Sequence, residues 1–292
     1  CMMDKGDNVP EPLLEKTQDS IEESLKLFKR WHNKSNERIR YAFSPRFALS
    51  CSEELLRDVG TIAIENKTIV HTHAAETQQE VETLLKQTGM RNIEYLEHLN
   101  LTHENLCLAH CVWLNDNELD IIKKGKVKVL HCPNSNLKLG SGVARISDMI
   151  YNSINVSIGV DAALFNANMD IFTEMRRAIS LQTQKTLSPE QTFKMATIEG
   201  AKALGLEREI GSIEVGKKAD IVILNNPRLG NEDMLLTMLN FTEPSDVETV
   251  LIDGRIILKN REFLSVDENE IIQASHTETK KLVSRAEKFG FK

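Results

Sequence analysis

Four short segments of the chain carry side chains that could bind a metal ion and use it in catalysis. Each one follows or ends a short apolar or β-branched run, which is typical of a buried strand. Residues just past the ends of parallel barrel strands converge on one face, where catalytic groups collect. Neutral imidazoles and carboxylates are ligands that suit Zn²⁺ or Fe²⁺. The segments are residues 71–76 (HTHAAE), 109–111 (AHC), 131–136 (HCPNSN) and 159–161 (GVD).

Taken singly, the ionisable residues of these segments have ordinary structural explanations. His73 could simply end a strand, Glu76 could cap the helix that follows, His110 could be a core histidine and Asp161 a loop residue. Together they form a pattern, because polar groups stand repeatedly at the ends of apolar strands, where burial without a partner is costly. We therefore predict a metal-dependent active site built from these residues.

Other polar residues near the segments are expected to have supporting roles. His71 shares the strand face of His73, and we expect it to pack beside the site rather than to bind metal. His131 is expected to be a neighbour of the site, and residues 134–136 to form a polar loop that could hydrogen-bond a substrate ring. The remaining histidines are expected at the surface: His32, His98, His103 and His276.

The composition favours a cytoplasmic α/β protein. Its 292 residues suit one large domain with an appendage. The net charge of −7, with no long basic run, argues against nucleic-acid partners and anionic membrane surfaces. No apolar stretch approaches the roughly 18 residues of a membrane span. Five cysteines, an odd number lying mostly beside predicted strands, indicate reduced thiols rather than a disulfide framework.

Strand and helix patterns alternate along the first 205 residues, which predicts a parallel sheet. The predicted strands are residues 39–43, 68–72, 106–109, 127–130 and 155–159. The predicted helices are residues 13–34, one beginning at 52–54, and 77–87, 115–124, 146–152, 169–182 and 189–204. Ser52 and Ser188 are predicted N-caps, Pro189 begins its helix, and Gly125 and Gly205 end theirs.

The pattern changes after Gly205. Residues 221–224, 247–252 and 256–258 read as strands, and Asp253-Gly254 between the last two is a hairpin signal. A charged, weakly amphipathic helix is predicted over residues 267–289. These changes divide the chain into a barrel (1–205), a β-sandwich portion (206–265) and a C-terminal helix (266–292).

Several motifs together resemble those of the metal-dependent amidohydrolases. The branch in question holds guanine deaminase, methylthioadenosine/S-adenosylhomocysteine deaminase, 5′-deoxyadenosine deaminase and the s-triazine chlorohydrolases. The likeness covers nearly the whole chain. It is carried by residues 44–52 (SPRFALSCS), 73–77 (HAAET), 109–114 (AHCVWL), 131–142 (HCPNSNLKLGSG), 159–161 (GVD) and 210–220 (IGSIEVGKKAD).

The resemblance implies a distorted TIM-like (β/α)8 barrel, a β-sandwich made from both chain ends, and roles for five residues. His73 matches a metal ligand on the fifth strand. Asp161 matches the eighth-strand ligand that also takes a proton from the attacking water. Glu76 matches the carboxyl group that shuttles a proton to the ring nitrogen. His110 matches the sixth-strand histidine near the water or the metal, and Arg46 an arginine that contacts the substrate ring.

The implied reaction is hydrolytic deamination of a purine base or an adenosine-type nucleoside, with one divalent metal, Zn²⁺ or Fe²⁺. A bound divalent metal lowers the pKa of water to about 7. Glu76 and Asp161 could divide the roles of proton donor and base. An s-triazine chlorohydrolase and a non-catalytic fragment are alternatives. The expected partner is a small heterocyclic substrate, with a homodimer as the expected assembly.

One departure from the family pattern concerns the first strand. In the family that strand ends in a His-x-His pair that binds the same metal, whereas His71-x-His73 fits the fifth-strand motif. The chain opens with Cys1, and the resemblance implies that it starts near the family's second strand. We therefore expect a truncated form of a longer enzyme, and if the polypeptide itself is that fragment, weak or absent metal binding and little activity.

Overall fold

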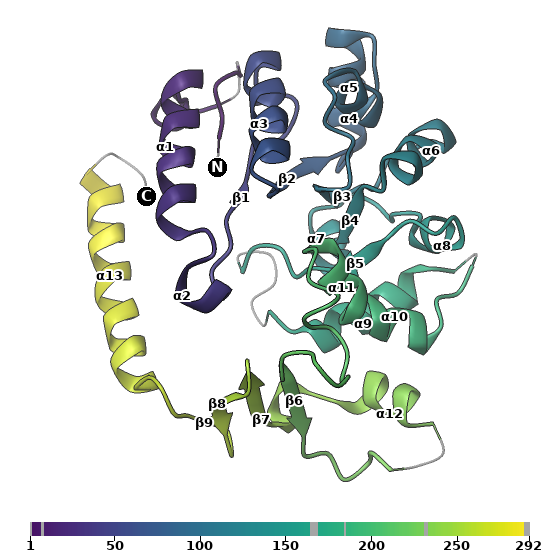
Figure 1. Ribbon diagram of the computed structural model, residues 1–292, viewed down its shortest axis with the longest axis vertical. Coiled ribbons are helices and arrows are strands. Elements are labelled where there is room, and N and C mark those ends of the chain that lie inside the picture. The colour runs from purple at the N-terminus through teal and green to yellow at the C-terminus, as the bar shows by residue number, and fades with distance from the viewer. Residues whose placement is uncertain (1, 7–8, 164–168, 184, 231–232, 289–292) are drawn as a thin grey trace.

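Five parallel strands form the framework of the first part of the chain (Figure 1). The computed structural model describes residues 2–6, 9–163, 169–183, 185–230 and 233–288, so Cys1 and Phe289 lie outside it. The strands pair in chain order, each parallel to the next, as consecutive strands of a barrel do. They are β1 (Ala42–Phe43), β2 (Ile69–Ala74), β3 (Leu106–His110), β4 (Lys128–His131) and β5 (Val156–Ile158).

All five predicted strands before residue 165 are present. The first is shorter than predicted, because Ile39 is bridged to Lys34 in an antiparallel turn instead of extending β1. Every residue of β3 is buried, whereas β2 and β4 alternate between buried and half-buried residues. The interior of the sheet therefore lies around β3, with Leu106, Leu108 and Val129 fully buried.

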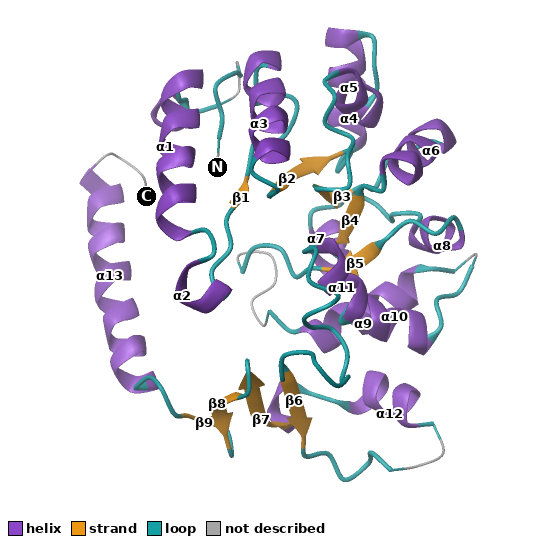
Figure 2. Cartoon of the chain, viewed as in Figure 1, coloured by secondary structure: helices purple, strands orange, loops and turns teal. Residues whose placement is uncertain are grey.

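Helices lie along the outer side of this sheet, and their ends follow local capping chemistry (Figure 2). Ser52 caps α3 by accepting a hydrogen bond from the Leu55 N–H, and Ser188 caps α10 in the same way, as predicted. The helices of this part are α1 (Thr17–Trp31), α2 (Lys34–Glu37), α3 (Glu53–Glu65), α4 (Gln78–Thr88), α5 (Asn92–His98), α6 (Asp116–Gly125), α7 (Pro133–Lys138), α8 (Ile146–Tyr151), α9 (Ile171–Leu181), α10 (Pro189–Met195) and α11 (Ile198–Ala203), with a 3-10 turn at Glu11–Leu13.

Two helix predictions need correction. The single helix predicted over residues 189–204 is two helices, because Thr197 has non-helical backbone angles. Its hydroxyl donates to the Phe193 carbonyl, a back-bond that competes with regular helix geometry. Helix α6 does end at Gly125, but the left-handed residue that closes it is Lys126, with φ of 54°, and not the glycine.

The second part of the chain contains an antiparallel sheet. Its strands are β6 (Ile221–Leu224), β7 (Val247–Ile252), β8 (Arg255–Lys259) and β9 (Glu262–Phe263), in that spatial order. The predicted Asp253-Gly254 turn joins β7 to β8, and both turn residues have positive φ. The described residues form one layer here, not the two layers of the implied sandwich.

Three helical elements accompany this sheet. Helix α12 (Met234–Phe241), which the sequence patterns did not predict, packs Met238 and Leu239 against Met175 of α9 and so joins the sheet to the barrel. A 3-10 turn (Pro244–Asp246) precedes β7. The predicted C-terminal helix is present as α13 (Glu268–Lys288), and none of its residues is buried.

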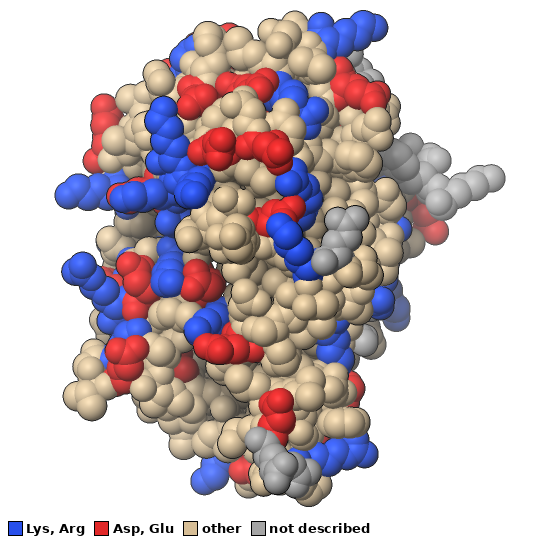
Figure 3. All heavy atoms as spheres, turned by 90° about the vertical axis from the view of Figure 1, so that its right-hand side faces the viewer, with Lys and Arg blue, Asp and Glu red and all other residues tan. Residues whose placement is uncertain are grey.

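Charged side chains of both signs are interspersed over the face shown in Figure 3. No helix in the described part of the chain has the length and apolar character to cross a bilayer. Cys51, Cys107, Cys111 and Cys132 are free and buried, which agrees with the expectation of reduced thiols.

Candidate active site

His73 lies at the carboxyl end of β2, and its ring is oriented by a backbone carbonyl. Its Nδ1 is 2.7 Å from the carbonyl oxygen of Arg46, which can only accept a hydrogen bond. The ring proton therefore sits on Nδ1, and Nε2 keeps its lone pair, as in a metal-binding histidine. Burial lowers the pKa of His73, so that the ring is neutral at pH 7.

Glu76 follows His73 by one tight turn. Ala75, between them, has φ of 50°, a left-handed conformation that is strained for a residue with a Cβ atom. One carboxylate oxygen of Glu76 accepts a hydrogen bond from the Ser141 hydroxyl at 3.2 Å. The other lies 3.7 Å from Nε2 of His110. The turn thus brings the predicted proton-transfer group to the histidine at the end of the neighbouring strand.

His110 ends β3 and is almost completely buried. Its Nδ1 is 2.8 Å from the side-chain oxygen of Asn136, to which it can donate a hydrogen bond, and its Nε2 faces Glu76. The His110 ring stacks on the His73 ring, with centroids 5.4 Å apart. The described geometry therefore brings His73, Glu76 and His110 together at one end of the sheet.

Asp161 lies beyond β5 and has φ of 60°. Its carboxylate accepts a short hydrogen bond from the Ser135 hydroxyl. Ser135 and Asn136 were expected in a polar loop, but residues 133–138 form helix α7, whose first four residues are buried. The helix begins with Pro133, one residue after the end of β4, and proline at the first helical position is a signal that could have identified it.

The remaining histidines follow the predictions with one exception. His71 is half-buried, and its ring is 5.9 Å from that of His73, consistent with a supporting role. His131 is fully buried near His110, and burial lowers its pKa to about 3. His98, His103 and His276 are exposed, as predicted. His32 is not, because it stacks on Phe28 and accepts a hydrogen bond from the Tyr41 N–H.

Arg46 contributes to the site through its backbone. Its carbonyl accepts hydrogen bonds from the Thr72 hydroxyl, the His73 N–H and the His73 ring. Its guanidinium is exposed and lies over the Phe47 ring at 5.9 Å. The predicted contact between the guanidinium and a substrate therefore stays a prediction, while the role of its carbonyl was not foreseen.

The donor types near His73 fit a divalent metal. The neutral His73 ring has a free Nε2, and Asp161 offers a carboxylate that Ser135 holds in place. Across the described residues, however, no three His, Cys, Asp or Glu side chains are grouped closely enough to hold an ion. The ligand set of His73, His110 and Asp161 is thus not pre-assembled and stays a prediction.

The chain is similar to proteins named as deaminases. It is 40% identical over 280 residues to the 5′-deoxyadenosine deaminase of Methanobrevibacter smithii, covering 92% of this chain and 63% of that protein. The crystal structure of an adenosine deaminase from Xanthomonas campestris, with bound zinc, matches 97% of this chain and 65% of its own length, with a TM-score of 0.89 and 27% identity. The chain therefore spans a little under two thirds of both proteins.

A chlorohydrolase has the same fold. Atrazine chlorohydrolase from Arthrobacter aurescens, complexed with zinc, matches 94% of this chain and 64% of its own length, with a TM-score of 0.86 and 22% identity. These structural matches confirm the predicted barrel-type α/β fold. The model of the Amidohydrolase family matches residues 1–257. The chain belongs to the amidohydrolase family.

Proposed function

We propose that the protein is a metal-dependent aminohydrolase that deaminates an adenosine-type nucleoside. The observation that carries the proposal is the carboxylate of Glu76, which lies between the Ser141 hydroxyl and Nε2 of His110 at the ends of β2 and β3. A carboxyl group in such a position can exchange protons with a heterocyclic ring nitrogen. The named activity of the 40% identical relative supports the choice of substrate.

His73 and Asp161 would hold the metal, with His110 as a third candidate and Zn²⁺ before Fe²⁺ as the ion. When bound, a divalent ion supplies Lewis acidity and lowers the pKa of water to about 7. The donor chemistry supports this assignment, since His73 is neutral with Nε2 free. Metal binding to such groups is pH-dependent, because the ligands must be deprotonated.

The protein groups would move protons and orient the substrate. Glu76 donates a proton to the ring nitrogen while water adds to the carbon that bears the amino group. Asp161, held by Ser135, takes the proton that the water loses. Asp161 then gives this proton to the amino group, ammonia leaves, and the hydroxyl proton returns to Glu76 as the ring carbonyl forms. His110 orients the attacking water, and Arg46 contacts the ring or its substituents.

A second candidate, a non-catalytic module, is favoured by one observation. No three potential ligands are grouped in the part of the chain that the structure describes. Elemental analysis of the purified protein, with its intact mass, separates the two candidates. About one equivalent of zinc or iron supports the enzyme, whereas a protein that stays metal-free in excess zinc supports the module.

The activity is tested by release of ammonia from 5′-deoxyadenosine, methylthioadenosine and guanine, and by release of chloride from atrazine. We expect ammonia from an adenosine derivative, loss of that activity with a chelator, and its return with Zn²⁺. Chloride release without ammonia would overturn the proposal in favour of a chlorohydrolase. No turnover of any substrate by the zinc-loaded protein would overturn catalysis altogether.

We further propose a cytoplasmic location, a place in purine metabolism and a homodimer. The four free, buried cysteines support a reducing compartment. Sedimentation equilibrium tests the assembly, and we expect twice the mass of one chain. A single-chain mass at micromolar concentration would contradict the homodimer.

A further inference from the structure

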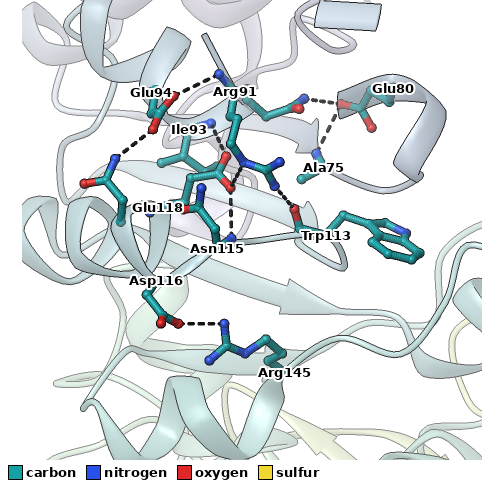
Figure 4. A network of polar contacts seen from close by, with 12 residues as sticks. Ala75, Glu80, Arg91, Ile93, Glu94, Trp113, Asn115, Asp116, Glu118 and Arg145 are labelled. Atoms are coloured by element: carbon teal, nitrogen blue, oxygen red, sulfur yellow. Dashed lines mark hydrogen bonds and ion pairs between the residues drawn. The ribbon is translucent and has the colours of Figure 1, made fainter. Parts of the chain in front are cut away.

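Glu80, in the first turn of α4, is a buried carboxylate with an unusual set of partners (Figure 4). One of its oxygens accepts hydrogen bonds from the Ala75 N–H and the side-chain amide of Asn92. The other accepts from the N–H of Glu76 at 2.8 Å. All three partners are donors, so the ionised carboxylate matches them completely.

The Glu80 side chain contacts different backbone groups from those contacted by the third residues of other helices. Glu80 is the third residue of α4, after the N-cap Thr77. At the same position in α5, Glu94 accepts from the N–H of its own N-cap, Arg91, as in an ordinary capping box. Glu80 instead reaches past its N-cap to the two residues before it. Its hydrogen bonds therefore hold the turn that carries Glu76.

That turn requires support. Ala75 has a left-handed backbone, which persists only where surrounding contacts determine it. Its carbonyl accepts from the Val112 and Trp113 N–H groups, at 3.0 and 2.9 Å. Glu80 secures the other side of the same residue through the Ala75 N–H. With the peptide fixed on both sides, the Glu76 side chain is directed toward Ser141 and His110.

We propose that Glu80 is a positioning residue for the reaction, which fixes the backbone of Ala75 and Glu76 so that the Glu76 carboxylate faces the substrate. This inference rests on the proposed function, because it assigns Glu76 the proton transfer. The inference concerns the orientation of the proton donor Glu76. Glu80 itself touches no reacting atom.

Glu80→Gln tests the role, because glutamine keeps the size of the side chain but turns one acceptor into a donor. In the zinc-loaded protein we expect kcat to fall at least tenfold, KM to change less than threefold, and zinc content to stay the same. Amide hydrogen exchange of peptides covering residues 70–80 should accelerate. The matched control is Glu94→Gln, another third-position carboxylate, which should retain kcat within twofold.

A double-mutant cycle distinguishes positioning from general loss of structure. If Glu80 acts through Glu76, adding E80Q to E76Q should lower the residual kcat by less than twofold. A full additional tenfold loss, or equal losses of kcat in E80Q and E94Q, would overturn the inference while leaving the proposed function intact. A parent protein that deaminates nothing would overturn the proposed function, and the catalytic role of Glu80 with it.

Discussion

Carbonyl oxygens decide which ring nitrogens of the site histidines are free. The Arg46 carbonyl takes the Nδ1 proton of His73, and the side-chain carbonyl of Asn136 takes that of His110. In both rings Nδ1 is therefore engaged, and Nε2 is the nitrogen left for other partners. His131 has no hydrogen-bond partner for either nitrogen within the described residues and is buried. Orientation thus distinguishes His73 and His110 from the neighbouring histidine.

Replacement of His73 by alanine should abolish stoichiometric metal binding. The substitution removes the free Nε2, and a site with few ligands loses most of its affinity when one is removed. We expect less than about a tenth of the parent's zinc after gel filtration, measured by elemental analysis. The control is His103→Ala, at an exposed position. Full zinc content in H73A would exclude this histidine as a ligand.

Glu76→Gln should reduce deamination without removing the metal. Loss of a positioned proton-transfer group costs about 10²–10⁴-fold in rate. Glutamine can still accept from the Ser141 hydroxyl, so the fold and the zinc content should be retained. Steady-state ammonia release measures the effect, with the exposed Glu97→Gln as control. An E76Q variant with parental kcat would show that the proton reaches the ring by another route.

Only part of the site could be predicted from the sequence. His73, Glu76, His110 and Asp161 could be found because their types recur where apolar strands end. Their partners could not, because these contacts join distant segments. Ser141 lies 65 residues from Glu76 in the sequence, and Asn136 lies 26 residues from His110. No local pattern records such pairings, which arise only when the strands are laid side by side.

Whole helices and strands were predictable where the apolar residues repeated regularly over a long segment or where the capping residues were clear. The five barrel strands and helices α3, α4, α6 and α9 satisfy these conditions. The missed helices are α2, α5, α7 and α12, and each has eight residues or fewer. Two turns of helix are too short for a 3.6-residue period to stand out, and tertiary packing rather than propensity stabilises them.

The end of α6 offers a prediction about local stability. Lys126 is exposed and left-handed, so Lys126→Gly should stabilise the protein by about 0.5–1 kcal/mol by relieving its Cβ strain. Lys124→Gly, at an exposed position inside the helix, should destabilise it by about 0.5–1 kcal/mol. Urea unfolding measures both changes. Effects of the same sign would contradict the assignment of Lys126 as the left-handed residue.

Gly125 is needed for a different reason than the one expected from the sequence. A Cβ atom at this position would lie 2.4 Å from the Thr102 carbonyl oxygen, a backbone atom. Gly125→Ala should therefore destabilise the protein by about 1–3 kcal/mol, as in other overpacked sites. The same urea experiment tests it, and an unchanged midpoint would show that this close approach relaxes at little cost.

The molecule as a whole combines elements that are buried to very different extents. The barrel part has a continuous core around β3, whereas the sheet β6–β9 joins it through the cluster of Met175, Met238 and Leu239. Helix α13 has no buried residue and is drawn apart from the sheet strands in Figure 1. The division of the chain into three parts, at residues 205 and 265, stays a proposal. The different burial of the three parts suggests how it can be tested.

Deletion of residues 266–292 should leave the stability of the rest nearly unchanged. Helix α13 exposes its larger apolar side chains, including Ile271, Ile272, Leu282 and Val283. Apolar surface that stays in water contributes little to folding. We expect the thermal midpoint of the truncated protein to agree with the parent's within about 2 °C, by calorimetry. A decrease above about 5 °C would mean that α13 packs on the rest of the protein in solution and contributes to its stability.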